Sequence, residues 1–401
     1  MNIAVLTQYF KPEMGAPQNR LYEMCTGLRR AGAQVCVVTG MPNYPTGSIF
    51  EGYKRCLSRK EFSEGMEIKR YWLYASNSKK ALPRVWNMLS FSFTALFSAR
   101  FLKRQKTEIL IVESPPLTLG VSAWMLSRLI GARLVLNVSD LWPLSAKELG
   151  ALRETGFTYK ALARLERFLY RKSWICMGQS QEIVSYMKQH GAETTYLFRN
   201  GVDPDRFSER KNPTEDGTAE NHPFKMVYAG LLGFAQGILG ICEHIDFKAT
   251  GAEFHIYGAG GEQKDLERYL TAHPDRGIFY HGKVDRTQIP EVLSRADATL
   301  IPLVTNIYGA VPSKIYESMA AGLPIFFSGE GEGRSIVQEN HIGWVSNASD
   351  FEELRHNIAH IAAHPEELAE KAKNCRLCAE EKFNRPKQIQ SLYAFLRERL
   401  G

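Results

Sequence analysis

Short apolar runs alternate along the chain with longer stretches whose apolar residues recur every three or four positions. An almost continuously apolar run is typical of a parallel strand buried on both faces, whereas the longer spacing is typical of a helix with one buried face. The strands expected in the first half are residues 3–7, 34–38, 108–112, 133–138 and 174–177. The helices expected between them include residues 19–31, 117–130 and 159–171. This alternation predicts a doubly wound α/β domain.

The pattern stops near the middle of the chain and then begins again. A turn at Asn200-Gly201 leads into a polar stretch, residues 208–223, which we interpret as a linker. Further strands are expected at residues 225–229, 253–257, 277–281, 298–301 and 323–327. We therefore expect an α/β protein with two Rossmann-like, doubly wound domains facing a cleft, residues 1–205 and 206–384. A last helix follows over residues 385–401, and the sequence leaves open whether it crosses back to the first domain.

Charge separates the two halves. The 401-residue chain carries a formal net charge of +7, with +12 in residues 1–205 and −5 in residues 206–401. A basic first domain predicts an anionic partner there. The first residues form a strand-like run without the features of a signal peptide, so none is expected, and the seven cysteines show no disulfide spacing. We therefore expect free thiols in the reducing cytoplasm, including Cys375 and Cys378, whose C-x-x-C spacing has no second pair to complete a zinc site.

One segment of the first domain, residues 84–102, is rich in aromatic residues and flanked by lysine and arginine. Its Asn, Ser, Thr and Arg residues interrupt it too often for a transmembrane helix. Two interpretations stay open. The segment is either an ordinary, partly buried helix, or a helix whose apolar face lies near a bilayer while its basic flanks contact anionic lipid.

The stretch from Val311 to Pro324 predicts a short helix that begins near Ser313 and ends before Gly322. Free N–H groups at a helix start favour a phosphate, and Lys314 adds a full positive charge. Glu317 lies one turn further on, where a carboxylate can accept both hydroxyls of a ribose. The alternative is an ordinary capped helix with a solvated glutamate.

Glycine-containing loops follow several of the expected strands. Gly15 lies in the loop after the first strand, Gly230 follows the first strand of the second domain, and Gly258-Ala259-Gly260 follows the next one. Ligands of α/β folds bind at the carboxyl ends of the strands, where these loops begin, and glycine permits the backbone to approach a ligand closely. A dinucleotide site is not expected at Gly258, because no acidic residue follows at the required spacing.

The order of these features resembles the retaining nucleotide-sugar glycosyltransferases of family 4, which have the GT-B architecture. The matching segments cover nearly the whole chain: Gly15, Arg199-Asn200-Gly201-Val202-Asp203, Gly230, Gly258-Ala259-Gly260, His281-Gly282-Lys283-Val284, Ala296-Asp297, and Glu317 with Met319-Ala320-Ala321-Gly322-Leu323-Pro324. Within the family, residues 312–317 and Ser139-Asp140-Leu141-Trp142-Pro143 resemble the WbuB-type branch. That branch builds O-antigen or capsule repeats and includes N-acetyl-L-fucosamine transferases.

The resemblance implies roles for individual residues. Glu317 would hold the donor ribose, Ser313 and Lys314 with the backbone of Gly15 would hold the diphosphate, and the backbone near Lys283 and Val284 would read the base. Asp140 would touch the donor sugar or help to position the acceptor. No cofactor and no metal ion is implied. Asp203-Pro204-Asp205 has the spacing of a D-x-D metal motif, but it follows a turn and is expected to cap a helix start.

The chain also departs from the family at three positions. Gly309 replaces a glutamate that usually contacts the donor sugar, while Leu231 and Gln236 replace two cations of the Gly230 loop. Lys314 would compensate for one lost cation. Arg199 would either compensate for the other or form an interdomain salt bridge. The lost glutamate suggests a donor sugar with an altered hydroxyl pattern, such as a deoxy or L-sugar.

The resemblance thus implies a retaining transfer of a sugar, such as N-acetyl-L-fucosamine, from a UDP-sugar to a sugar linked to undecaprenyl diphosphate. The reaction would belong to O-antigen or other polysaccharide biosynthesis, at the cytoplasmic face of the inner membrane with its anionic surface. We see no second carboxylate for a double displacement, so a front-face transfer is expected. Two alternatives stay open: a non-hydrolysing UDP-sugar epimerase, and a non-catalytic sugar-nucleotide-binding subunit of an assembly. No nucleic acid partner is expected.

Overall fold

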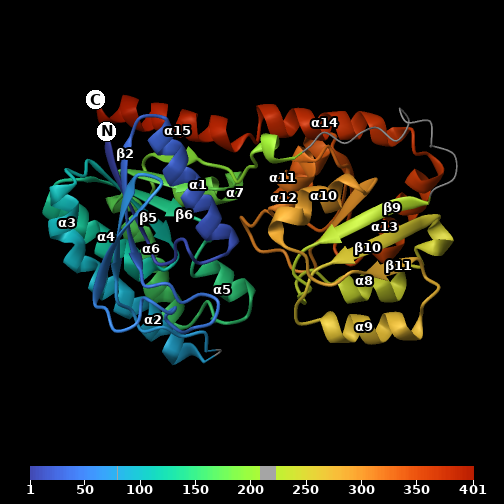
Figure 1. Cartoon of the computed structure of the whole chain (residues 1–401), viewed down its shortest axis with the longest axis horizontal. Coiled ribbons are helices and arrows are strands. Elements are labelled where there is room, and N and C mark those ends of the chain that lie inside the picture. Colours follow the sequence, from blue (N-terminus) through green and yellow to red (C-terminus); the bar gives the residue numbers. More distant parts are fainter. Residues whose placement is uncertain (79, 208–222) are drawn as a thin grey trace. The chain divides into compact units, whose positions relative to one another are not determined.

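The computed structural model describes residues 1–78, 80–207 and 223–401. The chain divides into two compact α/β units (Figure 1). Unit 1 comprises Met1–Arg199 and Pro386–Gly401, and unit 2 comprises Asn200–Arg385. The linker expected over residues 208–223 lies outside the described residues, apart from Pro223.

Unit 1 is built on an eight-stranded sheet with the strand order β3-β4-β2-β1-β5-β6-β7-β8. Its neighbouring strands run parallel except for the antiparallel pair β3 and β4. The strands are β1 (Asn2–Thr7), β2 (Gln34–Gly40), β3 (Ser58–Ser63), β4 (Met66–Tyr71), β5 (Ile109–Ser114), β6 (Arg133–Val138), β7 (Ile175–Gly178) and β8 (Thr195–Leu197). The helices are α1 (Ala16–Arg30), α2 (Ala81–Ala95), η1 (Leu96–Ser98), α3 (Ala99–Arg104), α4 (Leu117–Ile130), α5 (Leu144–Glu148), α6 (Phe157–Lys172), α7 (Gln181–Gln189) and α15 (Arg385–Leu400).

Unit 2 is built on a six-stranded parallel sheet with the order β11-β10-β9-β12-β13-β14. The strands are β9 (Phe224–Ala229), β10 (Ala252–Tyr257), β11 (Ile278–Tyr280), β12 (Ala298–Pro302), β13 (Ile325–Ser328) and β14 (Gly343–Ser346). The helices are η2 (Pro204–Arg206), α8 (Ile238–His244), η3 (Lys248–Thr250), α9 (Gln263–Ala272), η4 (Arg286–Gln288), α10 (Ile289–Ser294), α11 (Lys314–Ala320), α12 (Glu332–Glu339), α13 (Phe351–Ala363) and α14 (Glu367–Glu381).

The continuous apolar runs became the central strands because both faces of each sheet are covered. Every residue of β5 and of β12 is buried. The last helix, α15, packs into the core of unit 1, where Ile389, Leu392 and Leu396 lie in one buried cluster with residues of β1 and α1. The chain thus returns to its first unit after completing its second.

The boundary between the units lies before the position expected from the turn. Unit 2 begins at Asn200 and not at Arg206. The reason is that Val202 pairs with Asn384, and its backbone N–H donates to the carbonyl of Phe383 (3.0 Å). Both Val202 and Phe207 are buried in the core of unit 2. The turn therefore belongs to the second unit.

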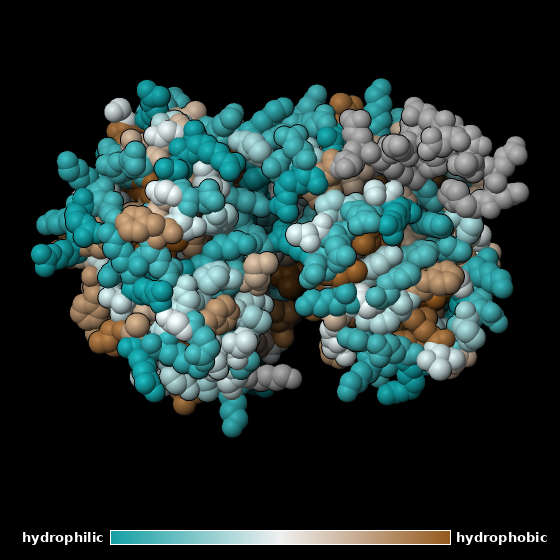
Figure 2. Space-filling model, viewed as in Figure 1, coloured by the Kyte–Doolittle hydropathy of each residue, from teal (hydrophilic) through white to brown (hydrophobic). Residues whose placement is uncertain are grey.

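The segment of residues 84–102 is divided among α2, η1 and α3. One side of α2 is buried against α4 and the sheet, and the other side is exposed. Among the described residues, no helix combines the length and the apolar character needed to cross a bilayer. On the face of the molecule drawn in Figure 2, apolar side chains reach the surface of unit 1 at several places among hydrophilic ones.

Candidate functional site

In unit 2 the site lies at the point where the strand order reverses. From β9 the chain proceeds outward to β10 and β11, and then returns to β12 on the other side of β9. The carboxyl ends of β9 and β12 therefore lie at a reversal of strand order, which is where ligands of open α/β sheets bind. The two loops are joined by a hydrogen bond from the Val304 backbone N–H to the carbonyl of Ala235 (2.9 Å).

Lys314 and Gly230 meet at this reversal point. Lys314 is the first residue of α11, and its side chain extends across the loop that begins with Gly230. A Cβ atom added at Gly230 would lie 2.5 Å from Lys314 Nζ and closer still to Cε. The ammonium also lies 5.2 Å from the centre of the Tyr228 ring, and the Tyr228 hydroxyl donates to the carbonyl of Leu231 (2.5 Å). Only a glycine at residue 230 leaves room for this cation.

The electrostatics of Lys314 suit an anionic ligand. Burial lowers the pKa of Lys314, and the nearby carboxylate of Glu317 opposes this shift. A desolvated ammonium is poorly screened, so an incoming phosphate would interact with it strongly. The sequence placed Gly230 and Lys314 in separate motifs, and the structure brings them into contact.

A second close contact lies between the glycine loops after β9 and β10. A Cβ atom added at Gly258 would lie 3.0 Å from the carbonyl carbon of Gly230 and closer to its oxygen. Gly258 also has a positive φ of 157°. Its N–H donates to the carbonyl of Gly282, and the Gly230 N–H donates to the carbonyl of Tyr257 (both 2.8 Å). The backbones of these two loops therefore pack closely against each other next to Lys314.

Ser313 and Glu317 lie at the first turn of α11. Ser313 is the residue before the helix, and its side chain makes no capping hydrogen bond. The Glu317 N–H donates to the Ser313 carbonyl (3.3 Å), as expected one turn along. One carboxylate oxygen of Glu317 lies 3.9 Å from the guanidinium of Arg286. No sequence motif marks Arg286, which follows the expected base-reading segment by two residues.

Lys283 and Val284 follow β11, beyond the Gly282 carbonyl that receives the Gly258 hydrogen bond. Lys283 is exposed and Val284 is half-buried. Their backbone therefore continues the line of loops that begins at Gly230. Six of the predicted site residues lie in unit 2: Gly230, Lys283, Val284, Ser313, Lys314 and Glu317. Gly15, Asp140 and Arg199 lie in unit 1.

The loop that carries Gly15 is held in place by a buried carboxylate. Gly15 precedes α1 in an extended conformation (φ −179°). Two residues before it, the fully buried Glu13 accepts hydrogen bonds from the backbone N–H groups of Phe10 (3.0 Å), Asn43 and Tyr44 (2.8 Å each). Burial raises the pKa of Glu13, and the three N–H groups oppose the rise. The shape of this loop is therefore fixed from within.

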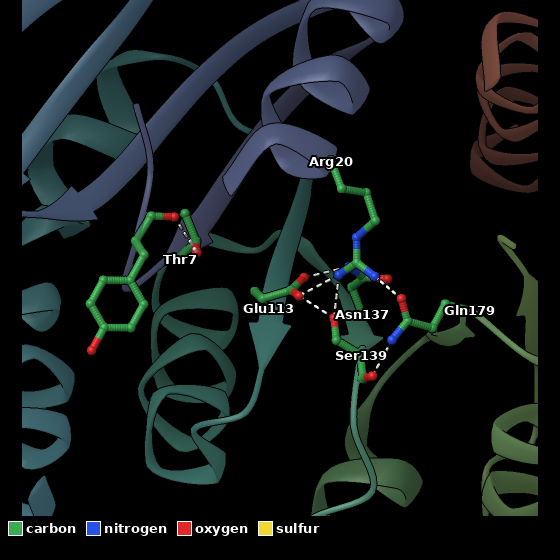
Figure 3. A network of polar contacts seen from close by, with 7 residues as sticks. Thr7, Arg20, Glu113, Asn137, Ser139 and Gln179 are labelled. Atoms are coloured by element: carbon green, nitrogen blue, oxygen red, sulfur yellow. Dashed lines mark hydrogen bonds and ion pairs between the residues drawn. The ribbon is translucent and has the colours of Figure 1, made fainter. Parts of the chain in front are cut away.

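A buried polar network crosses the carboxyl edge of the unit 1 sheet (Figure 3). Arg20 of α1 forms an ion pair with Glu113 of β5 (2.6 Å) and also donates to Ser139 and Gln179. Glu113 accepts hydrogen bonds from Asn137 and Ser139, and Gln179 donates to the Ser139 carbonyl. No sequence pattern predicts this network, because its members are far apart along the chain.

Asp140 directly follows Ser139 at the end of β6. It is partly exposed, and one carboxylate oxygen accepts a hydrogen bond from the Ser145 hydroxyl (3.0 Å). Burial raises the pKa of Asp140, opposed by the bonds from Ser145 and from the backbone of Leu141. The Arg20 network makes hydrogen bonds to both the hydroxyl and the carbonyl of Ser139, the residue before Asp140. It thereby fixes the backbone from which Asp140 extends.

The D-x-D spacing lies at the start of η2. The Asp203 side chain accepts a hydrogen bond from the Asp205 backbone N–H (3.3 Å) at the start of η2, which confirms the expected cap. Within the described part of the chain, no group of three His, Cys, Asp or Glu residues is arranged to hold a metal ion. All seven cysteines are free, and Cys375 and Cys378 are buried in α14.

Comparison with known proteins identifies both units. Residues 15–201 match the glycosyl transferase 4-like domain, and residues 210–377 match the glycosyl transferases group 1. The glycosyltransferase WbjE of Pseudomonas aeruginosa is 27% identical over 282 residues, which cover 67% of this chain and 69% of that protein. The colanic acid biosynthesis glycosyl transferase WcaI of Escherichia coli is 25% identical over 340 residues, with 80% and 82% coverage.

Solved structures share the fold over the whole chain. Sucrose-phosphate synthase of Thermosynechococcus elongatus superposes with a TM-score of 0.73 and 14% identity, covering 99% of this chain and 98% of that one. Anabaena HepE in complex with UDP superposes with a TM-score of 0.72 and 16% identity, covering 99% and 100%. The chain is therefore a glycosyltransferase of the GT-B fold, in which a glycosyl transferase 4-like domain is followed by a glycosyl transferases group 1 domain.

Proposed function

We propose that this enzyme transfers a sugar, with retention of configuration, from a UDP-sugar to a sugar carried on a lipid diphosphate during bacterial polysaccharide assembly. The observation that carries the proposal is the buried ammonium of Lys314 against Gly230, one turn before Glu317, at the strand reversal of unit 2. The names of similar proteins support the pathway, since WcaI is named for colanic acid biosynthesis. HepE, which shares the fold, binds UDP and UDP-glucose.

The donor nucleotide would lie along the loops of unit 2. Lys314 and Ser313 would contact the diphosphate, and Glu317 would accept the ribose hydroxyls. The backbone of Lys283 and Val284 would pair with the uracil edge. Gly15 of unit 1 would add a backbone N–H to the diphosphate, and Arg199 a further positive charge.

Catalysis would depend on stabilising the charge that develops on the departing UDP. The bond from the anomeric carbon to the phosphate oxygen breaks, so negative charge grows on the diphosphate. A fixed, desolvated ammonium at that place stabilises the transition state more than the bound donor. The leaving phosphate would take the proton of the acceptor hydroxyl on the same face of the sugar. Lys314 supplies the cation in this scheme, so we expect transfer to continue in the presence of a chelator.

Asp140 would orient the acceptor or touch the donor sugar. Its raised pKa would also permit a role as general base. Asp140→Asn separates these roles. Loss of transfer with unchanged donor affinity indicates a base or acceptor contact, whereas loss of donor affinity as well indicates a contact to the donor sugar.

The donor sugar is proposed to be a deoxy or L-sugar such as N-acetyl-L-fucosamine, as in the WbuB-type branch. Gly309 cannot contact a sugar hydroxyl with a side chain, and Leu231 in the neighbouring loop exposes 62% of its surface. An apolar side chain at this edge suits a sugar that has lost a hydroxyl. Faster turnover of UDP-glucose than of UDP-N-acetyl-L-fucosamine would refute this assignment.

The experiment that tests the proposed function is product analysis by mass spectrometry. The purified enzyme is incubated with candidate UDP-sugars and an undecaprenyl-diphosphate-linked sugar, with Glu317→Gln as the inactive control. A product heavier by one sugar, formed only with both substrates, supports the proposal. Conversion of the donor without an acceptor, or donor binding without any product, would contradict it. We also propose that the enzyme acts in the cytoplasm, bound peripherally to the inner membrane.

A further inference from the structure

The base-reading segment, residues 283–284, is held in place on its N-terminal side by His281. The His281 backbone N–H donates to the carbonyl of Ile256 (2.9 Å), and its ring nitrogen Nε2 lies 2.9 Å from Nδ1 of His255. The His281 ring also stacks on the ring of Tyr257, with the ring centres 4.4 Å apart and 12° between the planes. Because His255, Ile256 and Tyr257 belong to β10, these contacts fix the start of the segment to the sheet of unit 2.

A tight turn holds the C-terminal side of the same segment. Asp285 directly precedes η4, and its backbone N–H donates to the side-chain oxygen Oε1 of Gln288 (3.0 Å). In return the Gln288 N–H donates to the Asp285 carbonyl (2.9 Å). Reciprocal bonds between residues three apart fix the start of a helical turn. Arg286 is the first residue of this turn, so its backbone is anchored on both sides.

The Arg286 side chain extends from this turn to α11. One guanidinium nitrogen lies 3.9 Å from Oε1 of Glu317, and the two side chains are 44% and 27% exposed. Both residues belong to unit 2, so their contact does not depend on the position of unit 1. An ion pair as exposed as this one contributes little to the stability of the fold. The pair is therefore free to serve a ligand that binds beside α11.

Lys314, a second cation near Glu317, has a different task. Its ammonium lies against Gly230 and 5.2 Å from the centre of the Tyr228 ring, where it is positioned for a phosphate. Arg286 instead approaches the carboxylate of Glu317 from another element. A glutamate side chain has several rotatable bonds, and a neighbouring charge that restricts them lowers the entropy lost when a ligand binds. Arg286 can thus orient the carboxylate before the ribose arrives.

We propose that Arg286 is a positioning residue that orients the Glu317 carboxylate toward the ribose hydroxyls and thereby selects a ribonucleotide over a deoxyribonucleotide. This inference rests on the proposed function. A carboxylate that is held in place for two hydroxyls is left without partners when the ligand lacks them, so the analogue binds poorly. The same turn carries the base-reading segment, so one anchored piece of backbone positions the contacts to two neighbouring parts of the nucleotide.

The proposal is tested by titration calorimetry with UDP and with 2′,3′-dideoxy-UDP, which lacks both hydroxyls. Arg286→Gln should raise the Kd for UDP about three- to fivefold, which is the range for the loss of an exposed ion pair. It should leave the Kd for 2′,3′-dideoxy-UDP unchanged, so the discrimination between the two nucleotides falls by the same factor. Arg268→Gln is the matched control. Arg268 is 79% exposed on α9 and pairs with Asp265 (3.2 Å), and its loss should change neither Kd.

A second comparison uses a Glu317→Gln background, in which Arg286→Gln should weaken UDP binding no further. Unchanged UDP affinity of the Arg286 variant would overturn the proposal. Equal weakening of both nucleotides, or a further loss in the Glu317→Gln background, would also overturn it, because Arg286 would then act without the ribose carboxylate. A wild-type enzyme that binds UDP but transfers no sugar would contradict the proposed function and leave the role of Arg286 standing, so the two failures are distinguishable.

Discussion

Replacing Gly230 with alanine tests the contact between Gly230 and Lys314, on which the proposed donor site depends. The new methyl carbon would lie 2.5 Å from Lys314 Nζ, whereas unbonded heavy atoms of this kind stay about 3.5 to 4 Å apart. The lysine side chain is flexible and would retreat by about 1 Å or more, while the backbone of residue 230 has no need to move. We therefore expect the fold to survive and the ammonium to leave its place.

The size of the effect follows from the lost hydrogen bond. A bond between a charged donor and a phosphate oxygen contributes about 1.5 to 3 kcal/mol, and a displacement of about 1 Å removes it. Since about 1.4 kcal/mol corresponds to a factor of ten, the Kd for UDP should rise about ten- to a hundredfold. The free energy of unfolding should change by less than about 1 kcal/mol, because alanine also restricts the unfolded chain.

Titration calorimetry with UDP measures the affinity, and urea unfolding measures the stability. Gly240→Ala is the matched control, because a Cβ atom there meets only a ring atom of Phe351 at an ordinary 3.5 Å. The decisive comparison uses a Lys314→Ala background, where Gly230→Ala should cost almost nothing more. Unchanged UDP affinity in the single variant, or an equal loss in both backgrounds, would refute the reasoning.

Two further predictions concern buried carboxylates of unit 1. Arg20→Gln leaves Glu113 buried without its ion pair, so it should lower the free energy of unfolding by about 3 to 5 kcal/mol. The double variant Arg20→Gln with Glu113→Gln should lower it less, because no buried charge is left unpaired. An equal loss in both variants, measured by urea unfolding, would argue against the importance of the ion pair. Glu166 accepts hydrogen bonds from Tyr170 (2.8 Å) and Tyr186 (3.3 Å), yet burial raises its pKa to about 7 from 4.5. The folded state therefore holds this proton more tightly than the unfolded chain, so the stability that the group contributes is present below pH 4.5 and is lost as pH rises through about 7. Glu166→Gln should resemble the wild type near pH 4.5 and be more stable by about 3 kcal/mol at pH 8; a difference in melting temperature that does not vary with pH would contradict the assignment.

The central strands and long helices could be predicted from the spacing of apolar residues. A strand buried on both faces is apolar throughout, and a helix buried on one face has an apolar residue every three or four positions. The bounds of β6 and α4 agree with the residues expected, 133–138 and 117–130. Two of the missed strands, β3 and β14, carry little of that signal. All six residues of β3 are at least partly exposed, as suits an edge strand rich in charge, and β14 is only four residues long.

The candidate site residues could be proposed one by one from the sequence, but the contacts between them could not be predicted. Gly230 and Lys314 meet only because β9 and β12 are neighbours, and strand order is not a local property of the sequence. Arg20 and Glu113 are separated by 93 positions and belong to no motif. Asn87 stands inside an apolar segment, where only its polarity marks it as a residue that needs a partner. Arg286 has no signal beyond its position near the base-reading segment.

The return of α15 to unit 1 has a consequence for the synthesis of the protein. Translation delivers residues 1–199 first, yet Ile389, Leu392 and Leu396 complete the same apolar cluster as β1 and α1. The nascent first unit must therefore wait, with that surface of α1 uncovered, until the ribosome has made the whole of unit 2. During this interval the exposed surface is a target for chaperones and for aggregation. Unit 2, which is continuous from Asn200 to Arg385, has no such dependence and can finish folding first.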